Sequence, residues 1–190
     1  MNNTIKISII KLLTTVFIIL ISINQCIAQE NTVGLIQNNP RKSYYGYTLF
    51  APNRSTSTYL IDNVGRLINQ WDSDYNPGLS AYLLEDGNLL RSAAVPDPSE
   101  AAQQTGGFQK FDWDNNLVWQ FYYGTQHHDI EPLLNGNVLM VVNDRKNQNA
   151  AIQAGRDPSL ITGNNIRSLS IIEVRQTGHN TGEIVWQWNA

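Results

Sequence analysis

The stretch Gln126–Val142, QHHDIEPLLNGNVLMVV, decides the fold because two apolar strands flank the dipeptide Asn135-Gly136. A similar unit, SAYLLEDGNLLRS at Ser80–Ser92, surrounds Asp86-Gly87. Such dipeptides favour tight hairpin turns. We therefore predict two hairpins of one pattern, whose nearly continuous apolar strands are covered by neighbouring sheets on both faces.

A second signature accompanies each hairpin: an apolar strand, Asp, a short turn and a strand ending in Trp. It occurs in TYLIDNVGRLINQW at Thr58–Trp71 and FQKFDWDNNLVWQF at Phe108–Phe121, and with a longer turn at Leu169–Trp188. Four short strands in each repeat are typical of a β-propeller blade. The sequence therefore predicts an all-β protein with about three blades.

The spacing of the repeats supports the same prediction. Gly87 and Gly136 are 49 residues apart, and Trp71 and Trp119 are 48 apart. Trp119 and Trp186 are 67 apart, and the excess matches a polar insertion at Asn143–Asn165. Long loops of this kind are usually functional or disordered. Helical turns are expected only at 98–104 and, inside the insertion, at 149–154.

The N-terminal segment is predicted to be a secretory signal and not part of the fold. Lys6 and Lys11 lie before the run Leu12–Ile23, which is apolar apart from two threonines and a serine, and Cys26-Ile27-Ala28 is a small-x-small cleavage site. A membrane anchor is the alternative, although the run is shorter than the ~20 residues of a spanning helix. We expect a signal peptide at 1–28, an extended lead-in at 29–43 and a partial propeller at 44–190, starting with a strand at 44–52.

Cleavage after Ala28 leaves 162 residues and removes Cys26, the only cysteine. This excludes disulfide and thiol chemistry from the mature chain. Because Lys6 and Lys11 are also removed, 11 basic residues face 16 acidic ones, a net charge of −5. That balance argues against nucleic-acid or anionic-membrane partners. The expected location is the periplasm or the exterior of a bacterium.

In this order, GYTLFAP, TYLIDNVGRLINQW, LSAYLLEDGNLLRS, HHDIEPLLNGNVLMVV and EIVWQW resemble the bacterial arylsulfotransferase family. The resemblance covers about 145 residues, Gly46–Trp188. It implies a six-bladed propeller whose axial mouth binds an aryl sulfate. It further implies transfer of a sulfuryl group to a phenol through a sulfated histidine, without a cofactor or a metal.

Two adjacent histidines, His127 and His128, are the candidate catalytic residues. Imidazole supplies the N–H donors and the nucleophile that sulfuryl transfer needs. Neighbouring residues of a strand point to opposite faces, so only one imidazole is expected to address a given pocket. We favour His128, with Asp129 either orienting an imidazole or ending a turn. Without the resemblance, both histidines also fit exposed loop positions.

Basic residues in or beside the insertion are candidates for holding a sulfate: Arg145, Lys146, Arg156 and Arg167. Arg167 ranks first because it adjoins the strand LSIIEV and is held more rigidly than a loop tip. A solvated face explains the same clustering. Tyr123, next to Tyr122, is a candidate for stacking on an aryl group, although paired aromatics also pack between blades. His179, in a turn, is expected to be exposed.

The chain stops at Ala190, where similar proteins continue through further blades with additional histidines, including the one expected to be sulfated. We therefore expect a truncated or partial propeller without turnover of its own, or closure by self-association into a homo-oligomer. Two other functions fit the repeats: a secreted, non-catalytic propeller that binds a ligand or a protein, and a quinoprotein-like propeller.

Overall fold

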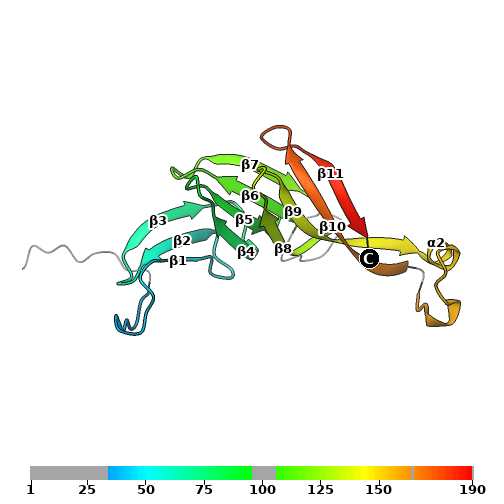
Figure 1. The fold of residues 1–190 in the computed structure, drawn as a ribbon, viewed down its shortest axis with the longest axis horizontal. Coiled ribbons are helices and arrows are strands. Elements are labelled where there is room, and N and C mark those ends of the chain that lie inside the picture. Colours follow the sequence, from blue (N-terminus) through cyan, green and yellow to red (C-terminus); the bar gives the residue numbers. More distant parts are fainter. Residues whose placement is uncertain (1–33, 96–105, 164, 190) are drawn as a thin grey trace, which may run out of the picture. The chain divides into compact units, whose positions relative to one another are not determined.

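The described residues, 34–95, 106–163 and 165–189 of a computed structural model, form three antiparallel sheets (Figure 1). Sheet 1 has the order β1-β2-β3, with β1 Tyr47–Phe50, β2 Ser57–Asp62 and β3 Leu67–Asp72. The predicted all-β class is confirmed. The expected signal peptide and the helical turn at 98–104 lie outside the described residues.

Sheets 2 and 3 each have four strands in chain order. Sheet 2 contains β4 Pro77–Leu83, β5 Leu89–Ala93, β6 Gly107–Phe111 and β7 Leu117–Tyr122. Sheet 3 contains β8 Gln126–Pro132, β9 Val138–Asn147, β10 Asn165–Gln176 and β11 Gly182–Asn189. The first strands of these two sheets, β4 and β8, lie next to each other.

The two predicted hairpins are present. In the β4–β5 turn, the Gly87 amide donates to the Leu84 carbonyl, and in the β8–β9 turn the Gly136 amide donates to the Leu133 carbonyl. Both glycines have positive φ, 81° and 84°, a conformation that favours glycine. Leu84 lies just beyond the end of β4 and not within a strand.

The first strands of sheets 2 and 3 carry the same irregularity. Gln126 pairs with Val142 and Ile130 with Met140, so β8 holds two more residues than β9 between these pairs. In β4 the pairs are Pro77 with Ala93 and Ala81 with Arg91, again with two extra residues. The bulges begin 49 residues apart, which is the spacing of the hairpin glycines.

Trp71 and Trp119, which are 48 residues apart, do not occupy equivalent positions in their sheets. A bulge after the turn that joins the last two strands of sheets 1 and 2 makes Asn69 the partner of Leu60 and Trp119 the partner of Lys110. Asn69 and Trp119 are therefore equivalent and 50 residues apart. Asp62 and Asp112 have the same separation, and each carboxylate accepts main-chain amides two and four residues later.

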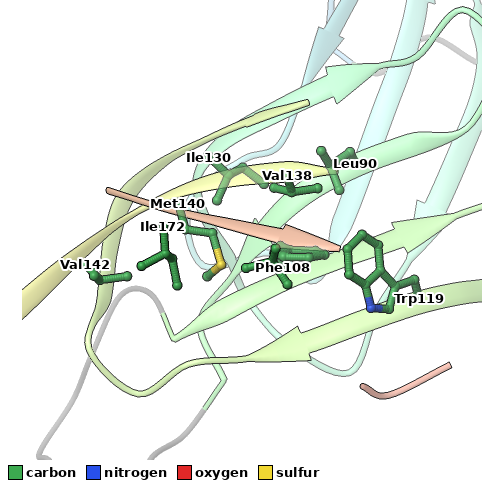
Figure 2. Close-up of a cluster of buried hydrophobic side chains, with 9 residues drawn as sticks. Leu90, Phe108, Trp119, Ile130, Val138, Met140, Val142 and Ile172 are labelled. Carbon is green, nitrogen blue, oxygen red and sulfur yellow. The ribbon is translucent and has the colours of Figure 1, made fainter. Parts of the chain in front are cut away.

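Each face of sheet 2 is buried against a different sheet. Leu89 and Phe111 pack with Leu60 and Trp71 of sheet 1. On the other face, a larger cluster joins sheets 2 and 3 (Figure 2). Its buried members are Leu90, Phe108, Trp119, Ile130, Val138, Met140, Val142, Ile172 and Val174. Within sheet 2, the rings of Phe108 and Trp119 pack edge to face with their centroids 4.6 Å apart. The prediction that both faces of an apolar strand are covered holds for β5.

The predicted polar insertion is largely a β-ribbon. β9 continues to Asn147 and β10 begins at Asn165, with paired residues up to that point. The remaining residues include α2 Gln148–Gln153, which confirms the helical turn expected there, and a short 3-10 helix at Pro158–Leu160. Asn147 caps α2 by accepting the Ala150 amide. The ribbon and α2 extend from sheet 3 in Figure 1.

Residues 34–46, most of them within the expected lead-in, contain no helix or strand. Asn63 in the β2–β3 turn holds the end of this segment, because its side chain bonds the Tyr44 carbonyl and the Gly46 amide. In the part of the chain that the structure describes, no helix is long and apolar enough to span a membrane.

Candidate functional site

The β8 bulge carries the candidate catalytic residues. His127, His128 and Asp129 lie between the paired residues Gln126 and Ile130, which are both buried. His128 has a φ of 61°. This left-handed conformation costs a non-glycine residue about 1–2 kcal/mol. The bulge is therefore a locally strained segment held between two anchored residues.

The expectation that the two imidazoles face opposite sides of the strand is wrong. Their Nδ1 atoms are 2.7 Å apart, and the rings meet edge to face with centroids 5.0 Å apart. Regular alternation fails here because the bulge and the positive φ of His128 rotate that side chain toward His127. The histidines form one unit with a shared hydrogen bond.

The environment of the pair selects a tautomer. His127 is half-buried and its Nε2 atom is enclosed without a hydrogen-bond partner, whereas His128 is exposed. Burial, followed by the nearby His128, lowers the pKa of His127, which favours the neutral ring. An enclosed N–H without an acceptor is less favourable than an enclosed lone pair. We therefore assign the His127 proton to Nδ1, where it is donated to His128 Nδ1.

This assignment gives His128 a defined role. Because its Nδ1 accepts the shared hydrogen bond, a neutral His128 carries its own proton on Nε2. His128 is exposed, so this N–H is available to an acceptor from solution. The pair therefore presents one oriented donor, suited to an anionic oxygen.

Asp129 contacts the main chain and a tyrosine, and no hydrogen bond joins it to either imidazole. Its carboxylate accepts the Ile130 amide at 2.9 Å and the hydroxyl of Tyr82, on β4, at 3.3 Å. Burial raises the pKa of Tyr82 to about 12, with further contributions from the Glu131 and Asp129 carboxylates. Tyr82 therefore remains a neutral donor. No pattern in the sequence indicates this role, because only the contact between β4 and β8 brings Tyr82 near the bulge.

Arg145 and Arg167 are direct register partners on β9 and β10. They belong to the paired ribbon and not to a loop, which places two arginines at one cross-strand position. The ribbon separates them from the histidines along the sheet. β8 begins opposite Val142, and Arg145 lies three residues, about 10 Å, beyond that point.

Tyr123 follows β7 and is half-buried. It packs against the cluster between sheets 2 and 3 and stacks on Phe121 with a centroid distance of 6.3 Å. Its carbonyl accepts the Gln126 amide at the start of β8. Tyr123 thus fixes the approach to the bulge through packing. His179 is exposed in the β10–β11 turn, as predicted.

A concavity of about 390 Å³ lies at the other end of β8, between the β4–β5 and β8–β9 turns. Leu84, Leu90 and Trp119 form its apolar wall, and Lys110 and Asp86 lie 3.6 Å apart beside it. Its volume is within the range of small-molecule sites. Among residues 34–95, 106–163 and 165–189, no group of His, Cys, Asp or Glu is placed to hold a metal.

Comparison with known proteins gives no family assignment. The chain matches no model of a known protein family, and no curated protein matches it.

Proposed function

We propose that the three sheets are consecutive blades of a β-propeller and that the protein belongs to the arylsulfotransferase line. The propeller is supported by two four-stranded sheets with equivalent bulges and by the contact between their first strands, β4 and β8. One observation carries the function: the His127–His128 pair, which presents a single oriented N–H from an exposed bulge.

In the proposed reaction, His128 donates its Nε2 hydrogen to an oxygen of the sulfate ester. Sulfuryl transfer develops charge on the sulfuryl oxygens and on the leaving aryl oxygen, so a fixed donor stabilises the transition state. A second imidazole nitrogen attacks sulfur, the sulfur–oxygen bond breaks, and the phenolate leaves with the electron pair. The acceptor phenol then attacks the same sulfur, releases its proton and frees the imidazole.

Arg145 and Arg167 are proposed to attract the sulfate, and Tyr123 to support the aryl subsite through packing. The two residues occupy directly opposed positions on β9 and β10. The partners implied by this proposal are an aryl sulfate and a phenol.

Binding of 4-nitrophenyl sulfate to this chain tests the proposal. We expect His128→Ala to weaken binding about tenfold or more, because a hydrogen bond to a charged group contributes roughly 1.5–3 kcal/mol. Binding of unsulfated 4-nitrophenol should be unchanged. In a longer form of the protein with further repeats, the same substitution should lower the rate of transfer to phenol by roughly 10².

Two variants serve as controls. His128→Asn keeps a residue that tolerates positive φ, so it separates loss of the imidazole from distortion of the bulge. His179→Ala removes the exposed turn histidine and should change neither binding nor rate. Equal affinities for 4-nitrophenyl sulfate and 4-nitrophenol would refute the sulfate site and favour a non-catalytic binding module. An unaltered affinity of His128→Ala for 4-nitrophenyl sulfate would also refute the sulfate site.

A further inference from the structure

The outer strands of sheets 1 and 2 each bind the turn that joins the last two strands of the next sheet. From β3, the Asn69 side-chain amide donates to the Trp113 carbonyl at 2.8 Å, and the Trp71 indole donates to the Asp112 carbonyl at 2.7 Å. Both acceptors are in the β6–β7 turn. Trp71 is fully buried by this contact.

Sheets 2 and 3 repeat the contact. The Trp119 indole on β7 donates to the Thr181 carbonyl of the β10–β11 turn at 3.1 Å. The main-chain amide of Gln120 donates to the His179 carbonyl of the same turn at 2.9 Å. Trp119 is 1% exposed. Because Trp119 occupies the register position of Asn69, a side-chain N–H at this position binds a turn carbonyl in both contacts.

The outer strand of sheet 3 carries the same donors. β11 has one extra residue between Ile184, the partner of Val174, and Trp186. This bulge makes Trp186 the partner of Glu173 and Trp188 the partner of Ile171. Trp186 therefore occupies the position of Asn69 and Trp119, and Trp188 that of Trp71. Both are 49% exposed, and within the described residues neither indole makes a hydrogen bond.

The apolar surface under these tryptophans also repeats. Directly opposed residues on neighbouring strands share a sheet face. Glu173 pairs with both Trp186 and Leu139, so these two side chains lie on one face. Ile171 pairs with both Trp188 and Val141, which lie on the same face. The counterparts of Leu139 and Ile171 in sheet 2 are Leu90 and Phe108, which are buried. We name this set the β11 face; it comprises Leu139, Val141, Ile171, Trp186 and Trp188. Exposed apolar patches of this kind mark interaction sites.

We propose that the β11 face binds the β2–β3 turn, Asp62–Arg66, of a second copy of this chain. That turn has the Asp-anchored geometry of the β6–β7 turn, with Gly65 and Asn115 at equivalent positive-φ positions. Its tip residue, Val64, is exposed. One chain thus supplies both halves of a contact that it already makes twice. The inference rests on this repetition and not on sulfuryl transfer.

Since the two surfaces differ, the contact is heterologous and joins copies head to tail. Sedimentation velocity and tryptophan emission test it with two variants. Trp186→Ser/Trp188→Ser removes the β11 face, and Asp62→Ala removes the carboxylate that shapes the turn. Far-UV circular dichroism and thermal unfolding establish that each variant is folded; Val64→Lys replaces Asp62→Ala if the latter is not.

We expect the unaltered chain to associate and each variant alone to be monomeric. An equal mixture of the two variants should form a heterodimer with blue-shifted emission, because each retains the surface that the other lacks. A monomeric unaltered chain would overturn the proposal. So would a mixture that stays monomeric, or association that needs the tryptophans and not the turn, which indicates nonspecific apolar contact.

Discussion

The His127–His128 pair shows how one backbone angle changes the chemistry of a side chain. With regular alternation, the rings face apart and each binds solvent independently. The positive φ of His128 brings the Nδ1 atoms to 2.7 Å and couples the two tautomers. The sequence identified the residues and favoured His128, but period-two reasoning does not detect a bulge, so the contact between the rings was not predicted.

Stability should fall as the pH drops below the usual histidine pKa of about 6.5. Burial and His128 lower the pKa of folded His127, so the unfolded chain takes up a proton first. Between the unfolded and the folded pKa of His127, the free energy of unfolding therefore decreases as the pH falls. Below the folded pKa it no longer changes through this group. Urea unfolding between about pH 7 and pH 5.5 measures this loss.

His127→Gln should reduce this pH dependence, whereas His179→Ala, at an exposed turn, should leave it almost unaltered. An identical slope in His127→Gln and the unaltered chain would contradict the assignment of a depressed pKa to His127. The same substitution tests the shared hydrogen bond, because it removes the donor that orients His128. It should therefore weaken aryl sulfate binding, though less than His128→Ala does.

At the scale of elements, local turn chemistry predicted the hairpins well. Asp86-Gly87 and Asn135-Gly136 form turns, and the flanking strands are paired. The Asn143–Asn165 insertion was predicted less well, because its polar strands lack the apolar alternation by which half-buried strands are recognised. Main-chain pairing extends the ribbon where the side chains give no signal.

Gly107→Ala should weaken the pairing of β6 with β7. A Cβ atom at this position would overlap the Phe121 carbonyl oxygen and approach Tyr122 Cα at 3.1 Å, both in the backbone of the partner strand. We expect a loss of roughly 1–3 kcal/mol, as for overpacked cores, measured by urea unfolding. Gly46→Ala, with no atom within 4 Å of the added Cβ, should be nearly neutral; equal losses would contradict the strand contact.

At the scale of the whole molecule, the repeats predicted three sheets in the correct order, but not how the sheets hold together. The contacts between sheets depend on register shifts, and the tryptophan spacing gave the wrong equivalence. The role of Arg91 also had no signal in the local sequence. It is fully buried in β5, and its guanidinium donates to the Thr56 carbonyl before β2 at 3.0 Å and to the Tyr75 carbonyl after β3 at 2.9 Å. It thus links sheet 2 to the two loops that flank the β2–β3 hairpin.

Arg91→Met should destabilise the fold by about 3 kcal/mol. The change leaves the Tyr75 carbonyl without its donor and removes one of the two donors to the Thr56 carbonyl, which keeps the Ser73 amide. Each lost hydrogen bond costs roughly 1–3 kcal/mol, and relief from burying a charge offsets part of this. Met140 occupies the equivalent position in sheet 3, so Met140→Leu is a matched control with an expected loss of less than about 1.5 kcal/mol. Thermal and urea unfolding measure both, and a stable Arg91→Met would show that the link is dispensable.

The two bulges also limit how the repeats can diverge. In β4, a Cβ atom at Gly78 would overlap the Ser92 hydroxyl, whereas the corresponding place in β8 holds His127. The added Cβ atom at 78 would also lie 2.6 Å from Ser92 Cβ, so any residue other than glycine at 92 restricts side chains at this bulge. Transplanting His-His-Asp onto 78–80 therefore requires Ser92→Gly first, and we expect the order of the two mutations to decide whether the intermediate folds.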